Sequence, residues 1–350
     1  FSQQVASRIA APQRGSTIQI YQSKWRKFCD WCDQRSLDHL KVPPTMMAQF
    51  FLELFESGLK PRTIEGYRSA IAHTYRLTGE WDVGSNPELS SLITNFYQQR
   101  PKTRPTVPDW DLAFVLHMLS EAPYEPLATA KLEHVTLKTV FLLTLAAGRR
   151  RGEVHALQVK KLEHTKHWMS VTIHTNPDFV AKTFIPRKGI GTLEPLEIPA
   201  LKSILSPDMK ADAVLCPVRA LRYYLDKTKD IRGQRTRLFI AYKPGHKGDI
   251  AMATIASWIK RVILRAYSTP SKDAQALYLP HPHAHELRGL AASWAAIGAT
   301  SLEDIMRACQ WRSPTTFTSY YLRDCTNMRD DMHVLGPVVM AQQVLVPNPK

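Results

Sequence analysis

The sequence GRRRGE at residues 148–153 directly follows the apolar run Thr139–Ala147, and a second stretch, HELR, occupies residues 285–288. In HELR the histidine and the arginine are three positions apart, so both side chains lie on the same side of a helix. A run of three arginines alone is typical of a solvated basic surface. The flanking glycine and glutamate, together with HELR downstream, instead indicate a site that uses the arginines.

Arg150 and Arg288 are of a residue type well suited to binding phosphate. The planar guanidinium group donates its N–H bonds in a fixed fork and can hold two oxygens of one phosphate at once. It also stabilises the negative charge that develops on the phosphate oxygens in a reaction at phosphorus. His285 can donate a hydrogen bond to the same phosphate or take part in proton transfer. These residue types have the chemistry that a phosphate-binding site needs.

Aromatic residues follow the second stretch. Trp311 comes first, then Thr316-Phe317, and then the pair Tyr320-Tyr321, which precedes Leu322-Arg323. The phenolate of a tyrosine can attack phosphorus and form a covalent phosphate ester. The indole N–H of Trp311 can donate a hydrogen bond.

In order and spacing, these residues resemble the tyrosine recombinase family, also called the phage integrase family. The family pattern is Gly-x-Arg-x-x-Glu, a lysine on a β-hairpin, His-x-x-Arg, a His or Trp, and then a nucleophilic tyrosine. The segment from Trp311 to Tyr321 looks most like recombinases of DIRS-like and Ngaro-like retrotransposons and of Cryptons. The N-terminal helices resemble the helical core-binding domain of the family, so the resemblance covers nearly the whole chain.

The resemblance implies a site-specific recombinase that cleaves and rejoins DNA strands through a 3′-phosphotyrosine intermediate, with no metal and no other cofactor. It makes Arg150, His285 and Arg288 the residues that act on the phosphate. Trp311 takes the position at which many members carry a second histidine. Glu153 lies one helical turn from Arg150 and is expected to orient that arginine from behind the site.

The general acid that protonates the departing 5′ oxygen is, by the same resemblance, a lysine on a β-hairpin between the two arginine motifs. Lys182, in the segment Phe179–Ile185 that we predict to be a strand, is the first choice. Lys188 lies in the next turn and is the alternative.

Two adjacent tyrosines compete for the role of nucleophile. Tyr320 is nine residues after Trp311 and Tyr321 is ten. The general family spacing favours Tyr320, whereas the Thr-Phe-x-x-aromatic-Tyr pattern of the retrotransposon enzymes and the following Leu-Arg favour Tyr321. We take Tyr321 as the nucleophile and keep Tyr320 as the alternative.

The charge of the chain points to the same kind of partner. Lys and Arg number 46 against 31 Asp and Glu, a formal net charge of +15. Such an excess favours an acidic partner, and nucleic acid is the commonest one. Basic residues also recur along the whole chain, which suggests a long footprint on double-stranded DNA. Examples are Lys24, Arg26, Lys60, Arg62, Arg68, Arg219, Arg222, Arg261 and Arg265.

The first hundred residues predict four amphipathic helices, because apolar residues recur at three- and four-residue steps. Ser16 and Thr45 are expected to cap the first two helices, and Gly58 to end the second. Pro61 and Pro87 are expected to begin the third and fourth.

The domain organisation follows from a break in composition. Residues 100–108 are rich in proline and basic residues, which is typical of a linker. We therefore predict a helical DNA-binding domain at 1–99 and a catalytic domain at 109–337. The remaining segment, 338–350, is apolar at its start. The resemblance implies that it docks into a neighbouring subunit, and the alternative is that it packs on its own domain.

The catalytic domain predicts a mixed fold. Strands are expected at Trp168–His174, Phe179–Ile185 and Leu193–Ile198, with helices before and after them. The fold class that we predict is α+β and mainly helical, with a small antiparallel sheet in the catalytic domain.

The resemblance implies a homo-oligomer, a tetramer on two DNA sites, in the service of a mobile element. We expect no membrane partner, because no apolar run approaches the length that spans a bilayer. The cysteine pattern and the lack of a leader predict an intracellular, reducing setting: the nucleus for a eukaryotic element, otherwise the cytoplasm. Since the chain begins at Phe1 and not at methionine, we expect it to be a piece of a longer product.

Two alternative functions stay open at this point. One is a DNA-binding protein derived from a recombinase that no longer cuts, and the other is a type IB topoisomerase. A metal site at the alternating histidines His281, His283 and His285 is not expected, because no cysteine or carboxylate joins them at a familiar zinc spacing.

Overall fold

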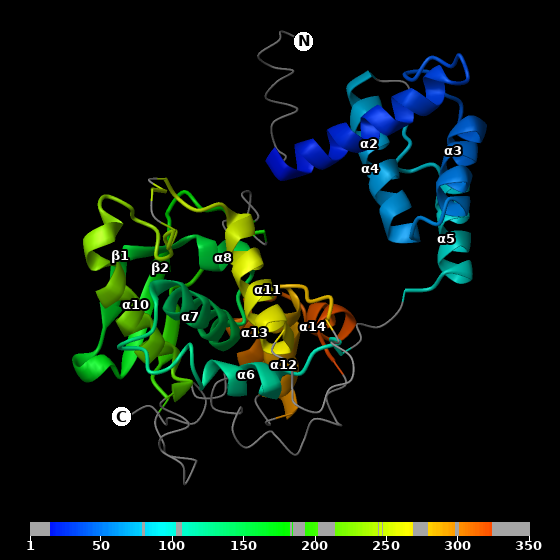
Figure 1. Cartoon of the computed structure of the whole chain (residues 1–350). Helices are drawn as coiled ribbons and strands as arrows, with labels where there is room; N and C mark the ends of the chain where they lie inside the picture. The colour runs from blue at the N-terminus through cyan, green and yellow to red at the C-terminus, as the bar shows by residue number, and fades with distance from the viewer. Residues whose placement is uncertain are drawn as a thin grey trace. The chain divides into compact units, whose positions relative to one another are not determined.

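The structure is a computed structural model, and it describes most of the chain in two compact units (Figure 1). One unit lies within residues 1–103 and the other within 104–350. The described residues are mainly helical with a small antiparallel sheet, so the predicted fold class is confirmed. The described ranges are 15–78, 81–102, 107–182, 184, 193–201, 214–243, 245–246, 248–268, 279–297 and 301–323.

The described part of the first unit consists of four helices around an aromatic core. Helix α2 packs on α4, and α5 packs on both α3 and α4. The rings of Phe55 and Phe96 stack with centroids 4.2 Å apart. At the edge of this core the Trp31 indole N–H donates to the Glu53 carboxylate at 2.7 Å. The helices are α2 (Gly15–Asp33), α3 (Pro44–Glu56), α4 (Pro61–Thr78) and α5 (Pro87–Gln99).

Proline and glycine set the ends of α3. The helix begins at Pro44, one residue before the predicted cap Thr45, and Pro43 is the N-cap. Proline suits the first helical position because its fixed φ is already helical and its missing N–H would have no partner there. Gly58, just after the helix, has a φ of +91°, a left-handed conformation that favours glycine. The predicted end of this helix is therefore confirmed.

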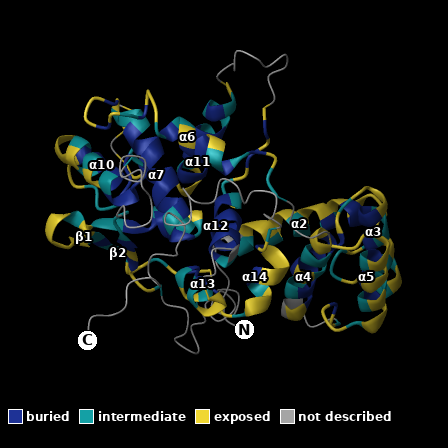
Figure 2. Ribbon diagram, turned by 90° about the horizontal axis from the view of Figure 1, so that it is seen from below, coloured by how far each residue is buried: buried dark blue, intermediate teal, exposed yellow. Residues whose placement is uncertain are grey.

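The second unit is built around α7 (Leu132–Ala147), which is buried along most of its length (Figure 2). Helices α10, α11 and α12 pack directly against α7. Its second half, Val140–Ala147, is almost wholly apolar, as expected of a helix at the centre of a domain. No helix in the described ranges is both long and apolar enough to traverse a lipid bilayer. The other helices are α6 (Leu112–Leu119), α8 (Arg151–His155), α10 (Pro217–Arg232), α11 (Met252–Ser268), α12 (Glu286–Ile297), α13 (Leu302–Ala308) and α14 (Pro314–Tyr320).

The sheet has the order β1–β2–β3, and both pairings are antiparallel. Strand β2 (Ser170–Thr175) is central, and its Val171 and Ile173 face the core. Strand β3 (Leu196–Pro199) overlaps the prediction, whereas β1 (Leu157–His164) was not predicted. A register shift between Leu157 and Leu162 breaks the alternation of β1, so its sequence lacks the period of two that identifies a strand.

The predicted strand at 179–185 is wrong for the residues that the structure describes there. After β2 the chain makes a turn, in which the Asn176 side chain accepts from the backbone N–H of Asp178 and the Asn176 carbonyl accepts from that of Phe179. A second turn follows, closed by the Phe184 N–H and the Ala181 carbonyl at 2.9 Å. Asparagine favours turns because its side chain satisfies the local backbone. The β-branched and aromatic residues of this segment therefore do not form a strand.

A buried cluster of charges ties α7 to α10. Lys138, fully buried in α7, donates to the Glu125 carboxylate at 2.5 Å and to the Leu119 carbonyl at 2.7 Å. Arg219 binds the same carboxylate with both ends of its guanidinium, at 2.8 and 3.0 Å. Burial lowers the pKa of Lys138 to about 8, although Glu125 acts to raise it. Glu125 is thus the counter-ion of both Lys138 and Arg219.

We expect Glu125→Gln to lower the free energy of unfolding of the second unit by about 3 kcal/mol, because it leaves a buried cation without its counter-ion. Urea unfolding of the full chain, followed by circular dichroism, measures the change. Glu121→Gln is the matched control, since Glu121 is an exposed carboxylate beside His117. A loss no larger than that of the control would show that the buried pairs contribute nothing.

Candidate active site

The loop between α7 and α8 places the first arginine motif. Gly148 caps the end of α7 with a φ of +55°, in the left-handed region, which turns the chain sharply out of the helix. Its carbonyl is thereby free to accept a hydrogen bond from the Arg288 Nη1 at 2.9 Å. Two motifs separated by 140 residues in sequence meet at this bond.

Arg288 is the most deeply buried charged residue of this site. It is 1% exposed, and a second guanidinium N–H donates to the carbonyl of Cys309, just after α13. Burial lowers the pKa of Arg288 from its usual range. The Nε atom is buried and has no hydrogen-bond partner among the described residues. The backbone thus fixes the plane of the guanidinium and leaves one donor unused.

Glu153 lies between the two arginines that the sequence singled out. Its carboxylate accepts from the Arg150 Nη1 at 2.8 Å and from the Arg150 backbone N–H at 3.0 Å. It also lies 3.7 Å from the Arg288 Nη1. Because Glu153 is buried, its charge is little screened, and it can orient both guanidinium groups.

The three arginines of GRRRGE have different environments. Arg151 is exposed, the side chain of Arg150 is 18% exposed, and Arg149 is buried. Arg149 donates to the Glu194 carbonyl at 3.3 Å and lines a cavity of about 10 Å³ together with Glu153. Burial lowers the pKa of Arg149. No role was predicted for Arg149, and the only signal for it was its place among the three consecutive arginines at 149–151.

An aromatic group closes the site. The Tyr321 ring lies 4.6 Å from the Trp311 ring and 5.2 Å from the His285 ring, measured between centroids. The Arg288 guanidinium lies 4.8 Å from the centre of the Trp311 ring and 5.4 Å from that of Tyr321. Phe317 stacks on the ring of Trp311, with the two ring centroids 5.5 Å apart. The structure therefore brings Arg288, His285, Trp311 and Tyr321 together.

The indole nitrogen of Trp311 is a second unused donor. It is buried and finds no hydrogen-bond partner in the described part of the chain. A buried donor without a partner costs about 1–3 kcal/mol, and a bound water, ion or ligand can supply the missing acceptor.

The two candidate tyrosines occupy different surroundings. Tyr321, which caps the end of α14, is 8% exposed and contacts the arginine and histidine as described. Tyr320, the last residue of α14, is 54% exposed. The described ring contacts with the site belong to Tyr321.

His285 is surrounded by positive charge. Burial of its ring lowers its pKa, and the charges of the neighbouring cations lower it further, to about 4. His285 is consequently neutral at physiological pH. The cations are Arg288, Arg150, Arg323 and Lys182.

Lys182 lies near the site, but the structure does not place it on the predicted strand. It lies in a turn and not on a strand, and its side chain is exposed. It is near enough to His285 for its charge to lower the pKa of that residue. The alternative lysine, Lys188, lies outside the described residues.

Arg323 was not predicted as a site residue. Its charge acts on His285, and its guanidinium lies over Gly289 of α12, with Nε 3.0 Å from where a Cβ would stand. Its position two residues after the candidate nucleophile was the only signal in the sequence.

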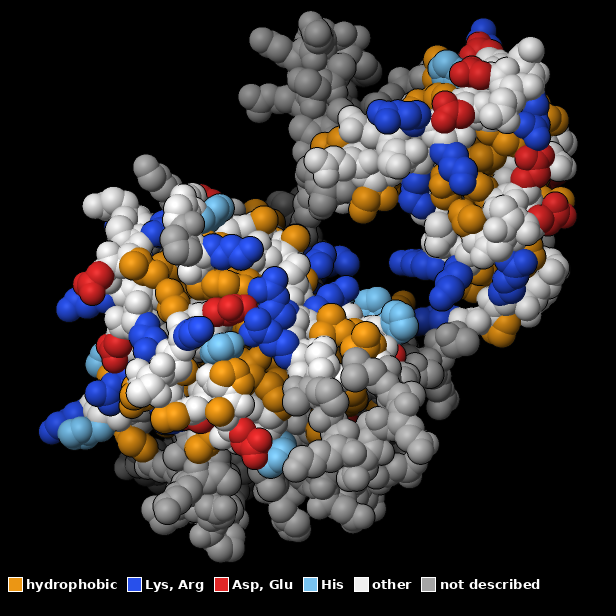
Figure 3. Space-filling view, in the orientation of Figure 1, with side chains coloured by type: hydrophobic (Ala, Val, Ile, Leu, Met, Phe, Trp, Pro, Cys, Tyr) orange, Lys and Arg blue, Asp and Glu red, His pale blue; other side chains and the backbone are white. Residues whose placement is uncertain are grey.

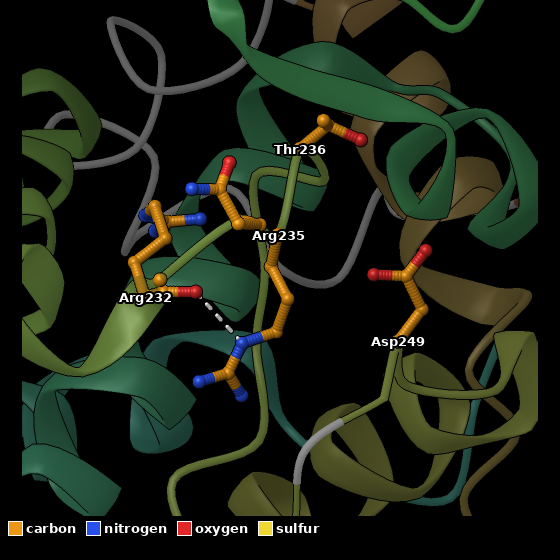
Figure 4. Close-up of a pocket in the computed structure, with 6 residues that line it drawn as sticks. Arg232, Arg235, Thr236 and Asp249 are labelled. Carbon is orange, nitrogen blue, oxygen red and sulfur yellow. Dashed lines mark hydrogen bonds between the residues drawn. The ribbon is translucent and has the colours of Figure 1, made fainter.

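A separate hollow of about 390 Å³ lies where α10 ends (Figure 4). Its arginines are engaged with the backbone. Arg235 donates to the Arg232 carbonyl at 2.9 Å, and Arg232 donates to the carbonyls of Arg237 and Leu238. They serve to hold the loop after the helix. Over the described ranges, no group of His, Cys, Asp and Glu is assembled as a metal site would require.

Solved structures resemble the chain over most of its length. The lambda integrase dimer bound to a COC′ core site is 16% identical with a TM-score of 0.53, covering 91% of this chain and 75% of that one. The Tn1549 transposon integrase in complex with transposon right end DNA is 13% identical with a TM-score of 0.53, covering 94% and 96%. A lambda integrase tetramer bound to a Holliday junction is 16% identical with a TM-score of 0.51, and the match covers 93% of this chain and 75% of that one. A scan of protein-family models and a search of curated proteins found no match. The chain therefore has the fold of these integrases.

We expect the pKa of His285 to lie near 4, and Arg323→Gln to raise it toward the ordinary value of 6.5 by removing one of the cations. Histidine ring signals in NMR spectra, assigned with His285→Gln, measure it. Arg307→Gln is the control, since Arg307 is an exposed residue of α13. Because the pKa is lowered in the folded state, the unfolded state binds more protons between pH 6.5 and about 4. His285 therefore lowers stability as pH falls through that window. A wild-type pKa near 6.5 would contradict the described surroundings.

Proposed function

We propose that this protein is a tyrosine recombinase, which cleaves and rejoins DNA at specific sites through a 3′-phosphotyrosine intermediate. The observation that carries the proposal is the position of Tyr321 against His285 and the buried guanidinium of Arg288. A nucleophile beside a fixed phosphate-binding group is the arrangement that phosphoryl transfer to a side chain needs. The integrase fold supports the same conclusion.

The proposed reaction assigns a role to each group. The Tyr321 oxygen forms a bond to phosphorus and loses its proton, with neutral His285 placed to accept it. The bond from phosphorus to the 5′ oxygen breaks, and Lys182 supplies the proton that this oxygen needs. Arg150 and Arg288 neutralise the charge on the non-bridging oxygens. Rejoining is the reverse, with the 5′ hydroxyl of a strand displacing the tyrosine.

The unused donors support a phosphate at this place. The Arg288 Nε and the Trp311 Nε1 are buried and lack acceptors among the described residues, and both groups contact the Tyr321 ring. Phosphate oxygens are acceptors that would satisfy such donors. Trp311 would then act in the role that a histidine has in many recombinases.

The proposal extends to the DNA partner and the assembly. Lys and Arg side chains lie on the visible face of each unit, which suits a long contact with a phosphate backbone (Figure 3). The tetramer of lambda integrase on a Holliday junction supports a homotetramer on two DNA sites. The Tn1549 integrase is a transposon protein, which favours a mobile-element role. The resemblance of the segment from Trp311 to Tyr321 favours a retrotransposon or Crypton element.

We expect a covalent protein–DNA adduct on Tyr321. The substrates are nicked duplexes that tile the DNA flanking the coding sequence, incubated with the protein in EDTA and separated under denaturing conditions. Tyr321→Phe should abolish the adduct because it removes the attacking oxygen. Tyr320→Phe, the adjacent matched control, should leave it intact. Peptide mass spectrometry identifies the modified residue.

Other outcomes of this experiment have definite meanings. An adduct on Tyr320 would keep the recombinase and overturn the choice of nucleophile. Tight binding without any adduct would instead indicate a DNA-binding protein that no longer cuts. An adduct that requires a divalent metal would contradict the role of the guanidinium groups.

We expect Arg150→Lys to slow adduct formation by about 100- to 1,000-fold, because lysine lacks the planar fork that holds two phosphate oxygens. The matched control is Arg151→Lys, since Arg151 is the next residue and is exposed. Its rate should stay near that of the wild type. Single-turnover kinetics on the same nicked duplex measure both variants. Equal effects would show that the arginines act only through general charge.

A further inference from the structure

One face of α12 receives the segment that carries the candidate nucleophile. His285, Gly289 and Ser293 are spaced four residues apart. They therefore line one side of α12, with His285 just before its first residue. The His285 ring contacts the Tyr321 ring. Gly289 and Ser293 meet the backbone and side chains that follow Tyr321.

The Ser293 hydroxyl bonds the backbone on both sides of Leu322. It donates to the Tyr321 carbonyl at 3.1 Å and accepts from the Arg323 N–H at 2.8 Å. Ser293 is fully buried, so water does not compete for these bonds. The last carbonyls of a helix lack partners within the helix, and α14 ends at Tyr320. Ser293 therefore satisfies backbone groups just where this helix stops.

Gly289 makes room for the same segment. A Cβ at this position would stand 3.0 Å from the Arg323 Nε and 3.4 Å from the Tyr321 carbonyl oxygen. The distance to the Arg323 Nε is short for a real Cβ contact, whereas the distance to the Tyr321 carbonyl is at the edge of ordinary van der Waals contact. That carbonyl belongs to the backbone that Ser293 holds. The absence of a side chain at residue 289 lets the segment lie directly on α12.

The phosphate-binding arginine and the seat of the tyrosine share one rigid element. Arg288 and Ser293 are five residues apart on α12, about 7.5 Å along the helix axis. Arg288 is itself fixed by the carbonyls of Gly148 and Cys309. A helix that holds both groups sets the distance between the attacking oxygen and the phosphate with little freedom.

We propose that Ser293 is a positioning residue, which holds the backbone at Tyr321 and Arg323 so that the phenol is presented to the phosphate bound by Arg288. The inference rests on the proposed recombinase chemistry. Ser293 does not touch the reacting atoms, and it acts through the main chain of the nucleophile.

The test is single-turnover adduct formation on the nicked duplex, measured over a range of DNA concentrations. Ser293→Ala removes both bonds, and the rate at saturating DNA should fall about 10- to 100-fold, as small misplacements of a reacting group do. The half-saturating DNA concentration should stay near the wild-type value. Ser293→Thr keeps the hydroxyl and should restore most of the rate.

A second comparison separates positioning from general loss of stability. Thr139→Ala removes a buried hydroxyl in α7 that donates to the carbonyls of Val135 and Ala220. This control should keep the wild-type rate. Ser293→Cys keeps nearly the same volume with a weaker hydrogen-bonding group, and its rate should lie between those of serine and alanine.

The outcomes separate the two claims. A wild-type chain that forms no adduct overturns the recombinase itself, and this inference with it. A wild-type adduct with an unchanged rate in Ser293→Ala overturns the role of Ser293 alone. Equal losses in Ser293→Ala and Thr139→Ala, or a Ser293→Thr variant as slow as Ser293→Ala, would reduce Ser293 to ordinary core packing.

Discussion

The burial of the Arg288 guanidinium is the constraint on which the site depends. A charge that is 1% exposed needs partners for its donors, and here the backbone provides them at Gly148 and Cys309. Those carbonyls come from the end of α7 and the end of α13, so three distant segments must meet before the arginine can be buried. The left-handed turn at Gly148 directs one of these two carbonyls toward the Arg288 guanidinium.

The charges around this arginine are arranged for an anion. Glu153 neutralises part of the charge of Arg150 and Arg288, while Lys182 and Arg323 add to the field that keeps His285 neutral. An excess of cations in a partly water-excluded place is costly unless a negative group enters. Under the proposed function a phosphodiester is such a group, and its transition state would be more negative still. The same excess that weakens the empty site strengthens the binding of that state.

The sequence predicted the residues whose chemical type the proposed reaction requires. It did not predict features that depend on local hydrogen bonds or on contacts between distant segments. GRRRGE and HELR identified arginines that the fold brings together, and the helical pattern with a small sheet is confirmed. The strand predicted at 179–185 was wrong because side-chain hydrogen bonding at Asn176 favours a turn. Strand β1 was missed because its register shift hides the alternation. Ser293 carried no signal, since a bond from a side chain to a distant backbone has no period or motif.

Two buried donors of the site lower the stability of the free protein. The Arg288 Nε and the Trp311 Nε1 are buried without acceptors among the described residues, and each such donor costs about 1–3 kcal/mol in the free protein. A hydrophobic side chain at position 311 would remove that cost there. What a hydrophobic side chain cannot do is donate to an oxygen that arrives beside the tyrosine. Under the proposed function a phosphate oxygen would satisfy these donors, and their cost in the free protein would return as affinity for that phosphate.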